Sequence, residues 1–507
     1  MTQTDRSAPL WLLVALQATV SAASLVVEIV AGRMIAPYVG MSLYTWTSII
    51  AVVLAGFSAG HWWGGRIAER DSTAALKRTG WAIVGAALTT GGAALVLRQL
   101  AEPVLHGVPD PLAAITVLTA LVFFLPSFFA GVPAPVLAVV AIRRDGQSGH
   151  ALGAMFAAGA IGAIAGTLLA GFLFISWLGS VATLSAVTAT YAMIALALFQ
   201  LAGIGAVRAT PMLVVLATAL GLAVGGLGLP RICDSESHYF CIRTVEMTPE
   251  RPGTVRLMVL DHLAHGITAR DEPLRMQTQH GAMLDGLPRM RMAGRPFRSF
   301  FIGGGSYSVP RAWAARGIGG ITVAEIDPEV TRIAARDFWF DPASATVLHE
   351  DARRALLDRP DTRYDVIVGD AFTDIAVPSH LITREFFELV HDRLTPDGIY
   401  AMNVIDHVDR LEALTALVAT LKTVFPSVEV WTEMRPPEPE ERRVFVLLAG
   451  QSQSPVDALT LAAPEPTDFA PLDDAFVTRL MAAKDPTILT DDFAPIDRLV
   501  GLGNLFD

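Results

Sequence analysis

Charged residues are scarce in this chain of 507 residues: 17% are Asp, Glu, Lys or Arg, whereas 52% are hydrophobic. Cysteine is scarcer still, with two in the whole chain, which excludes a disulfide-rich secreted scaffold. The mean hydropathy of +0.47 is too high for an ordinary soluble enzyme of this length. A composition this apolar also excludes a disordered chain.

The few charges are unevenly distributed. Residues 1–230 hold 10 of the 38 Lys and Arg and 7 of the 49 Asp and Glu, so this part is +3 and the remainder is −14. The pattern predicts a membrane domain over residues 1–230, followed by an acidic globular domain. An acidic globular domain argues against nucleic acid as a partner and suits a small cationic ligand.

Long apolar stretches with almost no acidic or basic residues predict about seven spans, because a spanning helix needs roughly 20 apolar residues. The spans are expected over residues 10–32, 44–65, 79–98, 112–140, 151–177, 180–203 and 210–229. Glycines crowd the fifth span at a spacing typical of close helix packing. Glu28 and His61 are ionisable groups at membrane depth, which makes them functional candidates. Their plainer alternatives are an ion pair with Arg33 and an interfacial position.

The side on which the globular domain emerges depends on the loops between the spans. Basic residues follow the second span at Arg66, Arg70, Lys77 and Arg78, and the fourth at Arg143 and Arg144. The positive-inside rule places both loops in the cytoplasm, so a chain with seven spans has its globular domain outside. A re-entrant or doubled fourth span, interrupted by prolines near residues 126 and 133, would change this parity.

The globular part predicts three regions. Residues 231–290 read as a small subdomain with a β-hairpin, because alternating runs flank a Pro- and Gly-containing turn. Residues 291–450 alternate strands with helices, which is typical of a Rossmann-like, doubly wound and mostly parallel sheet. Residues 451–507 are expected to form a tail packed on that domain. The ligand site of such a fold lies at the carboxyl ends of its strands.

Glycines follow the first expected strand of this sheet, at Gly303, Gly304 and Gly305. Glycines here let the backbone approach a ligand closely and open the next helix. The third glycine of the dinucleotide fingerprint is replaced by Ser308, which disfavours NAD.

Carboxylates follow the next three strands. Glu325 is placed to bind a ribose diol, Asp351 with Ala352 to meet an adenine, and Asp370 to take part in substrate chemistry. Taken singly, Asp351 fits a plain helix cap equally well. Together, in register with successive strand ends, these residues predict a nucleoside-binding site.

Several segments resemble the spermidine synthase family, in particular its membrane-fused branch. The resemblance rests on residues 302–305 (IGGG), 323–330 (VAEIDPEV), 349–353 (HEDAR) and 364–372 (YDVIVGDAF). Residues 236–239 (ESHY), a segment running from Glu28 to Tyr38, and residues 490–495 (TDDFAP) add to it. The resemblance implies a transferase that moves an aminopropyl group from decarboxylated S-adenosylmethionine to an amine.

The resemblance also implies residue roles. Glu325 would hold the ribose, Asp351 the adenine side, and Asp370 would activate the attacking amine. Three positions depart from the family's pattern: Ser306 stands where an acid usually follows the glycines, His265 replaces a glutamine, and Asp374 comes one residue late. Ser306 then lies on the donor side, and His265, Asp374 and Tyr239 on the acceptor side.

Two alternatives remain open from the residues. One is methyl transfer from S-adenosylmethionine on the same fold, since the loss of an acid at Ser306 removes a partner for an aminopropyl ammonium. The other is a nucleoside-sensing or transport protein without turnover. We expect a small cationic amine and membrane lipid as partners, a homodimer as the assembly, and no metal.

Cys233 and Cys241 lie just past the last span. A cytoplasmic domain would keep them as thiols, whereas an outward-facing one could join them in a disulfide. Because the adenosyl donor is made in the cytosol, we expect a cell (inner) membrane protein with a cytoplasmic catalytic domain and reduced thiols.

Overall fold

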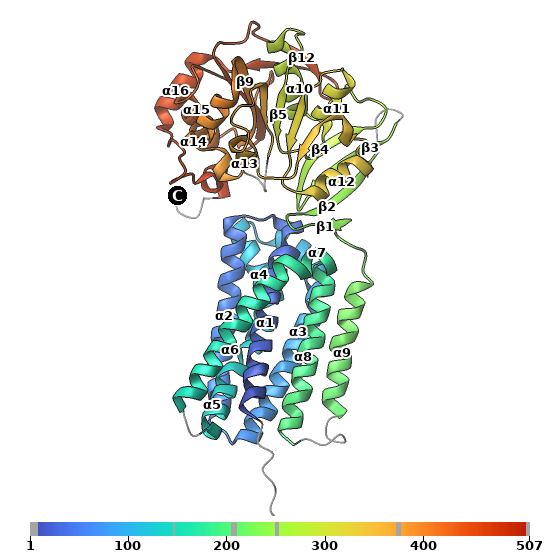
Figure 1. Ribbon diagram of the computed structural model, residues 1–507, viewed down its shortest axis with the longest axis vertical. Helices are drawn as coiled ribbons and strands as arrows, with labels where there is room; N and C mark the ends of the chain where they lie inside the picture. The colour runs from blue at the N-terminus through green and yellow to red at the C-terminus, as the bar shows by residue number, and fades with distance from the viewer. Residues whose placement is uncertain (1–8, 146–147, 204–209, 249–252, 372–376, 503–507) are drawn as a thin grey trace, which may run out of the picture. The chain divides into compact units, whose positions relative to one another are not determined.

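The computed structural model describes residues 9–145, 148–203, 210–248, 253–371 and 377–502 (Figure 1). Two compact units share the chain: Met1–Cys241, here called the helical unit, and Ile242–Asp507, called the sheet unit.

The helical unit is built from long apolar helices, seven of which are long and apolar enough to cross a membrane. This agrees with the seven predicted spans. The helices are α1 (Leu10–Val39), α2 (Leu43–Ala68), α3 (Ser72–Gly107), α4 (Pro111–Gly131), α5 (Pro133–Asp145), α6 (Ser148–Leu169), α7 (Ile175–Leu178), α8 (Ser180–Leu201) and α9 (Thr210–Leu227), with a π-helical turn at Ala170–Phe174 between α6 and α7.

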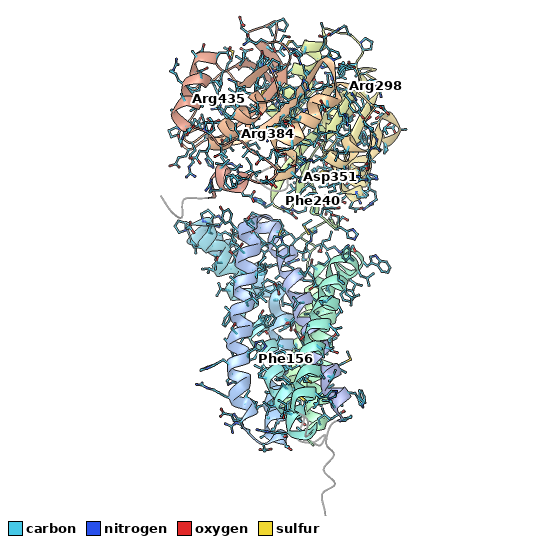
Figure 2. The ribbon with its side chains drawn as sticks, turned by 60° about the vertical axis from the view of Figure 1, so that its left-hand side comes forward. Phe156, Phe240, Arg298, Asp351, Arg384 and Arg435 are labelled. Atoms are coloured by element: carbon cyan, nitrogen blue, oxygen red, sulfur yellow. A yellow bond between two sulfur atoms is a disulfide. The ribbon has the colours of Figure 1, made fainter. Side chains whose placement is uncertain are left out.

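Large apolar side chains cover the outside of this unit. Phe156, which Figure 2 labels on α6, is 72% exposed, and Phe172 and Trp177 are exposed to a similar degree. Inside, hydroxyl groups bond back to carbonyls one turn earlier: Thr79 to Ala75, for example, at 2.9 Å. A unit that bonds these hydroxyl groups internally and exposes apolar surface is compatible with a lipid environment.

Two features predicted for the spans are confirmed. Gly162 and Gly166 of α6 face the carbonyl oxygens of Ala18 and Ala22 on α1 so closely that a Cβ at either glycine would clash. The fourth span is broken where expected, between α4 and α5, but Val132 keeps helical angles (φ −61°, ψ −40°) and α4 and α5 together form a single span.

Cys233 and Cys241 are joined by a disulfide, with their Cα atoms 5.2 Å apart. The prediction of reduced thiols is therefore wrong. A short strand β1 (Ser235–Glu236) lies between them, and the backbone N–H of Ser237 donates to the carbonyl of Phe240 at 2.9 Å. This turn reverses the chain and brings the two cysteines together, which their spacing alone does not reveal.

The sheet unit begins with antiparallel strands β2 (Cys241–Met247, whose first residue closes the helical unit), β3 (Val255–Leu260) and β4 (Leu263–Ala269). A nine-stranded sheet follows, in the order β12-β13-β10-β11-β9-β8-β5-β6-β7. Its strands are β5 (Ser299–Ile302), β6 (Ile321–Ala324), β7 (Thr346–Leu348), β8 (Tyr364–Gly369), β9 (Leu394–His407), β10 (Ser427–Glu433), β11 (Arg442–Gly450), β12 (Leu459–Ala462) and β13 (Pro466–Pro471).

Strands β5 to β9 are parallel, whereas β10 to β13 pair antiparallel, so the sheet is more mixed than the expected mostly parallel one. Strands of the parallel part, such as β8, are apolar and buried because helices cover both faces. The helices are α10 (Gln279–Met292), α11 (Ser308–Ala315), α12 (Pro328–Asp337), α13 (Ala352–Leu357), α14 (Arg384–Arg393), α15 (Glu412–Lys422) and α16 (Asp474–Lys484). The order β7-β6-β5-β8-β9-β11-β10, with β11 antiparallel, defines a Rossmann-like fold with a mixed sheet.

Candidate active site

The loops after β5 and β8 touch at the carboxyl edge of the sheet. Gly303 has φ +91°, and a Cβ built on it would lie 2.8 Å from the carbonyl oxygen of Asp370. Gly305 also has a positive φ, of +50°. Only glycine fits this conformation and this close approach without strain. The glycine loop and Asp370, which the sequence places at the same edge of the sheet, are therefore in contact.

Glu325 follows β6 and fixes the same glycine loop. Its Oε2 accepts from the backbone N–H of Gly304 and its Oε1 from that of Asp327, both at 2.9 Å. Burial raises the pKa of Glu325, and the two backbone bonds oppose this rise. Each oxygen keeps a further lone pair, so the carboxylate is oriented and still able to accept from a ligand hydroxyl.

Asp351 serves as the N-cap of α13, as the plainer interpretation expected: its Oδ1 accepts from the backbone N–H of Arg354 at 3.0 Å. Its Oδ2 lies 2.7 Å from Nε2 of His380. Burial alone would raise the pKa of Asp351, but these hydrogen bonds lower it. Ala352 is buried as the first residue of α13. A helix cap and a ligand contact are compatible at this position, and the ligand contact stays a prediction.

Strand β4 brings His265 to the glycine loop. A Cβ built on Gly305 would lie 3.3 Å from the carbonyl oxygen of His265, and Gly266 lies directly against the hydroxyl of Ser306, which is 2% exposed. Among the described residues, Nε2 of His265 is buried without a hydrogen-bond partner. Burial, with the charges of His280 and His262, lowers its pKa to about 4. His265 is thus a neutral imidazole with an unused ring nitrogen, on a strand whose backbone lies against the glycine loop.

Asp370 is held by Asn403 of the neighbouring strand β9, whose Nδ2 donates to Oδ1 of Asp370 at 2.9 Å. Burial raises the pKa of Asp370, while the electrostatic interaction with His280 and the bond from Asn403 lower it. The net shift is upward, which makes this carboxylate a better proton acceptor than an exposed one.

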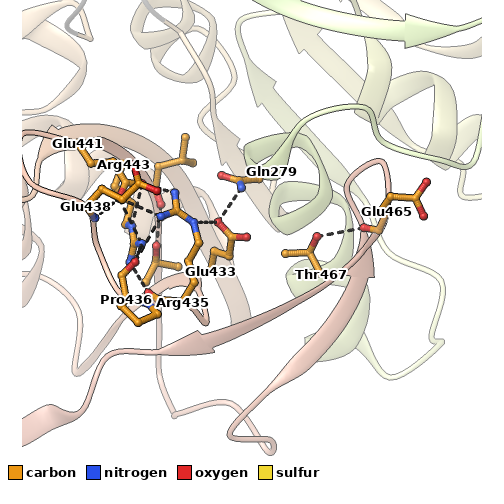
Figure 3. Close-up of polar contacts among 11 residues, drawn as sticks. Gln279, Glu433, Arg435, Pro436, Glu438, Glu441, Arg443, Glu465 and Thr467 are labelled. Carbon is orange, nitrogen blue, oxygen red and sulfur yellow. Dashed lines mark hydrogen bonds and ion pairs between the residues drawn. The ribbon is translucent and has the colours of Figure 1, made fainter. Parts of the chain in front are cut away.

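Sequence reasoning missed Asn403 and His280. Asn403 stands near the end of the expected strand 398–404, so the strand-end argument used for Asp370 would have found it. His280 lies in the first turn of α10, where Thr278 caps the helix by accepting from the N–H of Gly281. Its neighbour Gln279 donates to Glu433 at 2.8 Å (Figure 3). No motif marks His280, because its place depends on how α10 docks on the sheet.

Arg435 and Glu441 reinforce this docking point. Arg435 bonds both Glu433 and Glu441 (Figure 3). Burial would raise the pKa of Glu441, but hydrogen bonds from Arg435 and Arg443 and from the backbone bring it down to about 2. The Glu433 carboxylate, which accepts the hydrogen bond from Gln279, is therefore itself held in place by the guanidinium group of Arg435.

The structure does not test the proposed position of two acceptor-side residues, Asp374 and Tyr239, relative to the glycine loop and Asp370. Asp374 lies outside the described residues. Tyr239 belongs to the helical unit, where its carbonyl oxygen accepts from Arg33 at 2.5 Å. Their roles stay predictions. In the part of the chain that the structure describes, no group of three His, Cys, Asp or Glu side chains is arranged to hold a metal ion.

Comparison with known proteins finds a family match over the part of the chain that holds the glycine loop, Glu325 and Asp370. Residues 300–457 match the family model described as the spermine/spermidine synthase domain. The C-terminal part of the chain therefore carries a spermine/spermidine synthase domain.

Individual relatives carry two kinds of name. An N-terminal histidine N-methyltransferase of Emericella nidulans is 30% identical over 243 residues, which cover 46% of this chain and 40% of that protein. A polyamine aminopropyltransferase of Vibrio vulnificus is 36% identical over 124 residues, covering 23% of this chain and 42% of that protein. The chain thus spans about two fifths of the length of these relatives, both transferases by name.

Among solved structures, a probable spermidine synthase from Corynebacterium glutamicum is 20% identical, with a TM-score of 0.43. The match covers 51% of this chain and 96% of that one.

Proposed function

We propose that this chain is a membrane-anchored transferase that moves an aminopropyl group from decarboxylated S-adenosylmethionine to an amine. The observation that carries the proposal is the pairing of a glycine loop with a buried carboxylate, Asp370, whose pKa is raised and whose backbone lies against Gly303. The spermine/spermidine synthase domain over residues 300–457 supports the choice of reaction.

In this reaction a neutral amine nitrogen attacks the aminopropyl carbon next to the sulfonium. The C–N bond forms as the C–S bond breaks, and the bonding pair passes to sulfur, which leaves methylthioadenosine. The attacking amine loses one proton, and Asp370 is the group proposed to accept it. Asn403 keeps the carboxylate oriented through the bond to Oδ1.

The sulfonium donor, decarboxylated S-adenosylmethionine, is proposed to lie along the carboxyl ends of β5, β6 and β7, next to the glycine loop. Glu325 would accept from the ribose hydroxyls, Asp351 and Ala352 would border the adenine, and residues 303–306 would line the sulfonium side. Glu325 is supported by its fixed orientation, because two backbone N–H groups hold it. On the acceptor side we propose His265, with Tyr239 and Asp374 as further candidates, and a small cationic amine as substrate.

Methyl transfer from S-adenosylmethionine is the second candidate. Two observations favour it: Ser306 stands where the family has an acid, and one relative is named a methyltransferase. A neutral serine at position 306 gives an aminopropyl ammonium no carboxylate at this point of the site.

Release of methylthioadenosine separates these two reactions. The purified full-length chain, given decarboxylated S-adenosylmethionine and a panel of primary amines, should release methylthioadenosine only when an amine is present. No release with any amine, together with S-adenosylhomocysteine formed from S-adenosylmethionine, would reject aminopropyl transfer in favour of methyl transfer.

We further propose that the helical unit spans a membrane and that the sheet unit lies outside the cytoplasm. In the sequence, eight of the 10 Lys and Arg of residues 1–230 lie in the N-terminal segment or near the ends of the second, fourth and sixth spans. Arg143 donates to the carbonyls of Ala68 and Arg70, so two of these basic segments share one end of the unit. By the positive-inside rule this end is cytoplasmic.

The disulfide marks the opposite end. Arg33 donates to the carbonyls of Ser237 and Tyr239, and Arg98 to that of Pro230, so the ends of α1 and α3 that carry these arginines lie beside the bonded segment. Disulfides persist in oxidising compartments, which lie outside the cytoplasm, and this disulfide is at the end of the unit opposite to the basic end. Two independent rules thus favour an outward-facing sheet unit. This reverses the side expected from the origin of the adenosyl donor.

A pair of fusions tests this side. Alkaline phosphatase, which folds only outside the cytoplasm, should be active when fused after residue 507, and green fluorescent protein at the same position should be dark. Bright fluorescence with inactive phosphatase would place the sheet unit in the cytoplasm.

A further inference from the structure

A pocket of about 400 Å³ opens in the helical unit, at the end where Cys233 and Cys241 are joined. Its walls come from α1, α3, α7, α8 and α9 and from residues 229–236. Figure 1 shows α7 and β1 at this end of the bundle. Two segments that the sequence singled out meet here, since Arg33 belongs to the first and Glu236 to the second. The proposed transferase reaction uses neither Arg33 nor Glu236.

Three guanidinium groups line the pocket: Arg33, Arg98 and Arg231. Arg33 and Arg98 donate to backbone carbonyl oxygens, and Nε of Arg33 is buried without an acceptor. Within the described part of the chain, none of the three is bonded to a carboxylate. Guanidinium groups that no carboxylate neutralises are suited to bind an oxyanion, and phosphate matches their forked geometry best.

Two carboxylates also line the pocket, Asp234 and Glu236. Oε2 of Glu236 accepts from the backbone N–H of Ser180 at 2.8 Å and from its hydroxyl at 2.7 Å, at the start of α8. Because both bonds use one oxygen, Oε1 remains able to accept from an ammonium group. Three guanidinium groups and the remaining oxygen of Glu236 therefore suit a ligand that carries a phosphate and an ammonium together.

The remaining wall is apolar, with Met34, Leu97 and Val181 among its side chains. The pocket lies at one end of the spanning helices, the level at which lipid headgroups meet the acyl chains. An apolar wall beside the charged groups would accommodate the start of an acyl chain.

We infer that this pocket binds a phosphodiester that carries a primary ammonium, supplied by a phospholipid with an ethanolamine headgroup. The phosphate lies against Arg33, Arg98 and Arg231, and the ammonium against Glu236. The inference rests on the proposed membrane insertion of the helical unit. It does not depend on which group the sheet unit transfers.

Lipid retention by the detergent-purified full-length chain tests this site. Native mass spectrometry after partial delipidation should show phosphatidylethanolamine retained roughly tenfold more tightly than phosphatidylcholine, whose quaternary ammonium donates no hydrogen bond. R231Q and R98Q should each weaken retention about tenfold. R78Q is the matched control, because Arg78 is an exposed arginine at the basic end, and it should bind as the parent does.

Two further arms make the result decisive. E236Q should remove the preference for phosphatidylethanolamine over phosphatidylcholine while leaving total lipid retention unchanged. Soluble phosphoethanolamine should compete weakly; competition as strong as that of the lipid would overturn the lipid source. Equal retention of both lipids by the parent chain, or equal loss in R78Q and R231Q, would overturn the site. Because Arg231 is exposed, R231Q is informative even if R98Q fails to fold.

Discussion

The side-chain amide of Asn403 donates a 2.9 Å hydrogen bond to the carboxylate of Asp370, and so links the carboxyl end of β8 to the neighbouring parallel strand β9. The bond gives Asp370 a fixed direction in a buried setting. Its backbone in turn limits residue 303 to glycine. The glycine loop and the proposed base Asp370 therefore help to position each other.

Replacing Asp370 by Asn should lower turnover by roughly 10²–10⁴-fold while donor affinity changes little, because Asn keeps the shape and cannot take the proton. Steady-state kinetics and calorimetry with methylthioadenosine measure the two effects. Asp358→Asn, an exposed site, is the matched control. Near-normal kcat in Asp370→Asn would remove Asp370 from the mechanism.

Asn403→Ala should act through Asp370. Without the amide the pKa of Asp370 rises further, so the acid limb of the kcat profile should move to higher pH. Activity should therefore recover partly as the pH is raised, whereas a purely structural defect would lower kcat equally at every pH. An unshifted profile would show that Asn403 does not tune the base.

Glu325→Gln should weaken binding of methylthioadenosine at least tenfold, since hydrogen bonds to a charged group are worth about 1.5–3 kcal/mol each. Calorimetry on the full-length chain gives the affinity, and thermal unfolding shows whether the glycine loop survives. Glu329→Gln changes an acid four residues away that pairs with Arg332, and should have no effect. Equal affinities in both variants would reject the ribose assignment.

His265 should make stability depend on pH. Its pKa in the folded chain is about 4, below the usual value near 6.5, so the unfolded chain binds more protons between these values. Stability should thus fall as the pH drops from about 6.5 to 4 and be unaffected above that window. In His265→Gln the thermal midpoint should vary less across this range. An identical pH dependence in both chains would mean that His265 is not the buried neutral group described.

The disulfide should stabilise the helical unit. Closing so short a loop is worth about 2.5 kcal/mol. Reductant should lower the thermal midpoint of the native chain but leave that of a Cys233→Ser, Cys241→Ser double variant unchanged, because the chain has no other cysteine. A reductant effect of equal size in both chains would contradict this assignment.

The sequence predicted most where hydrophobic pattern decides structure. Seven spans and the strand-end residues Glu325, Asp351 and Asp370 all follow from periodicity and from one topological rule. The elements that it missed depend on contacts between distant segments. The disulfide depends on the turn at Ser237, which brings the two cysteines together. The position of His280 depends on the docking of α10 through the bond between Gln279 and Glu433. The strands β12 and β13 form only because β13 pairs with the edge strand β10, and their sequence alone resembles an irregular tail.

The central claim is that the reaction transfers an aminopropyl group. The most direct measurement offers the full-length chain both sulfonium donors at once, each isotopically labelled in its transferable group, with a panel of amines, and weighs the products. The account predicts an amine heavier by the labelled aminopropyl group, formed together with methylthioadenosine and lost in Asp370→Asn. An amine that carries only the labelled methyl group, with S-adenosylhomocysteine as the second product, would contradict it.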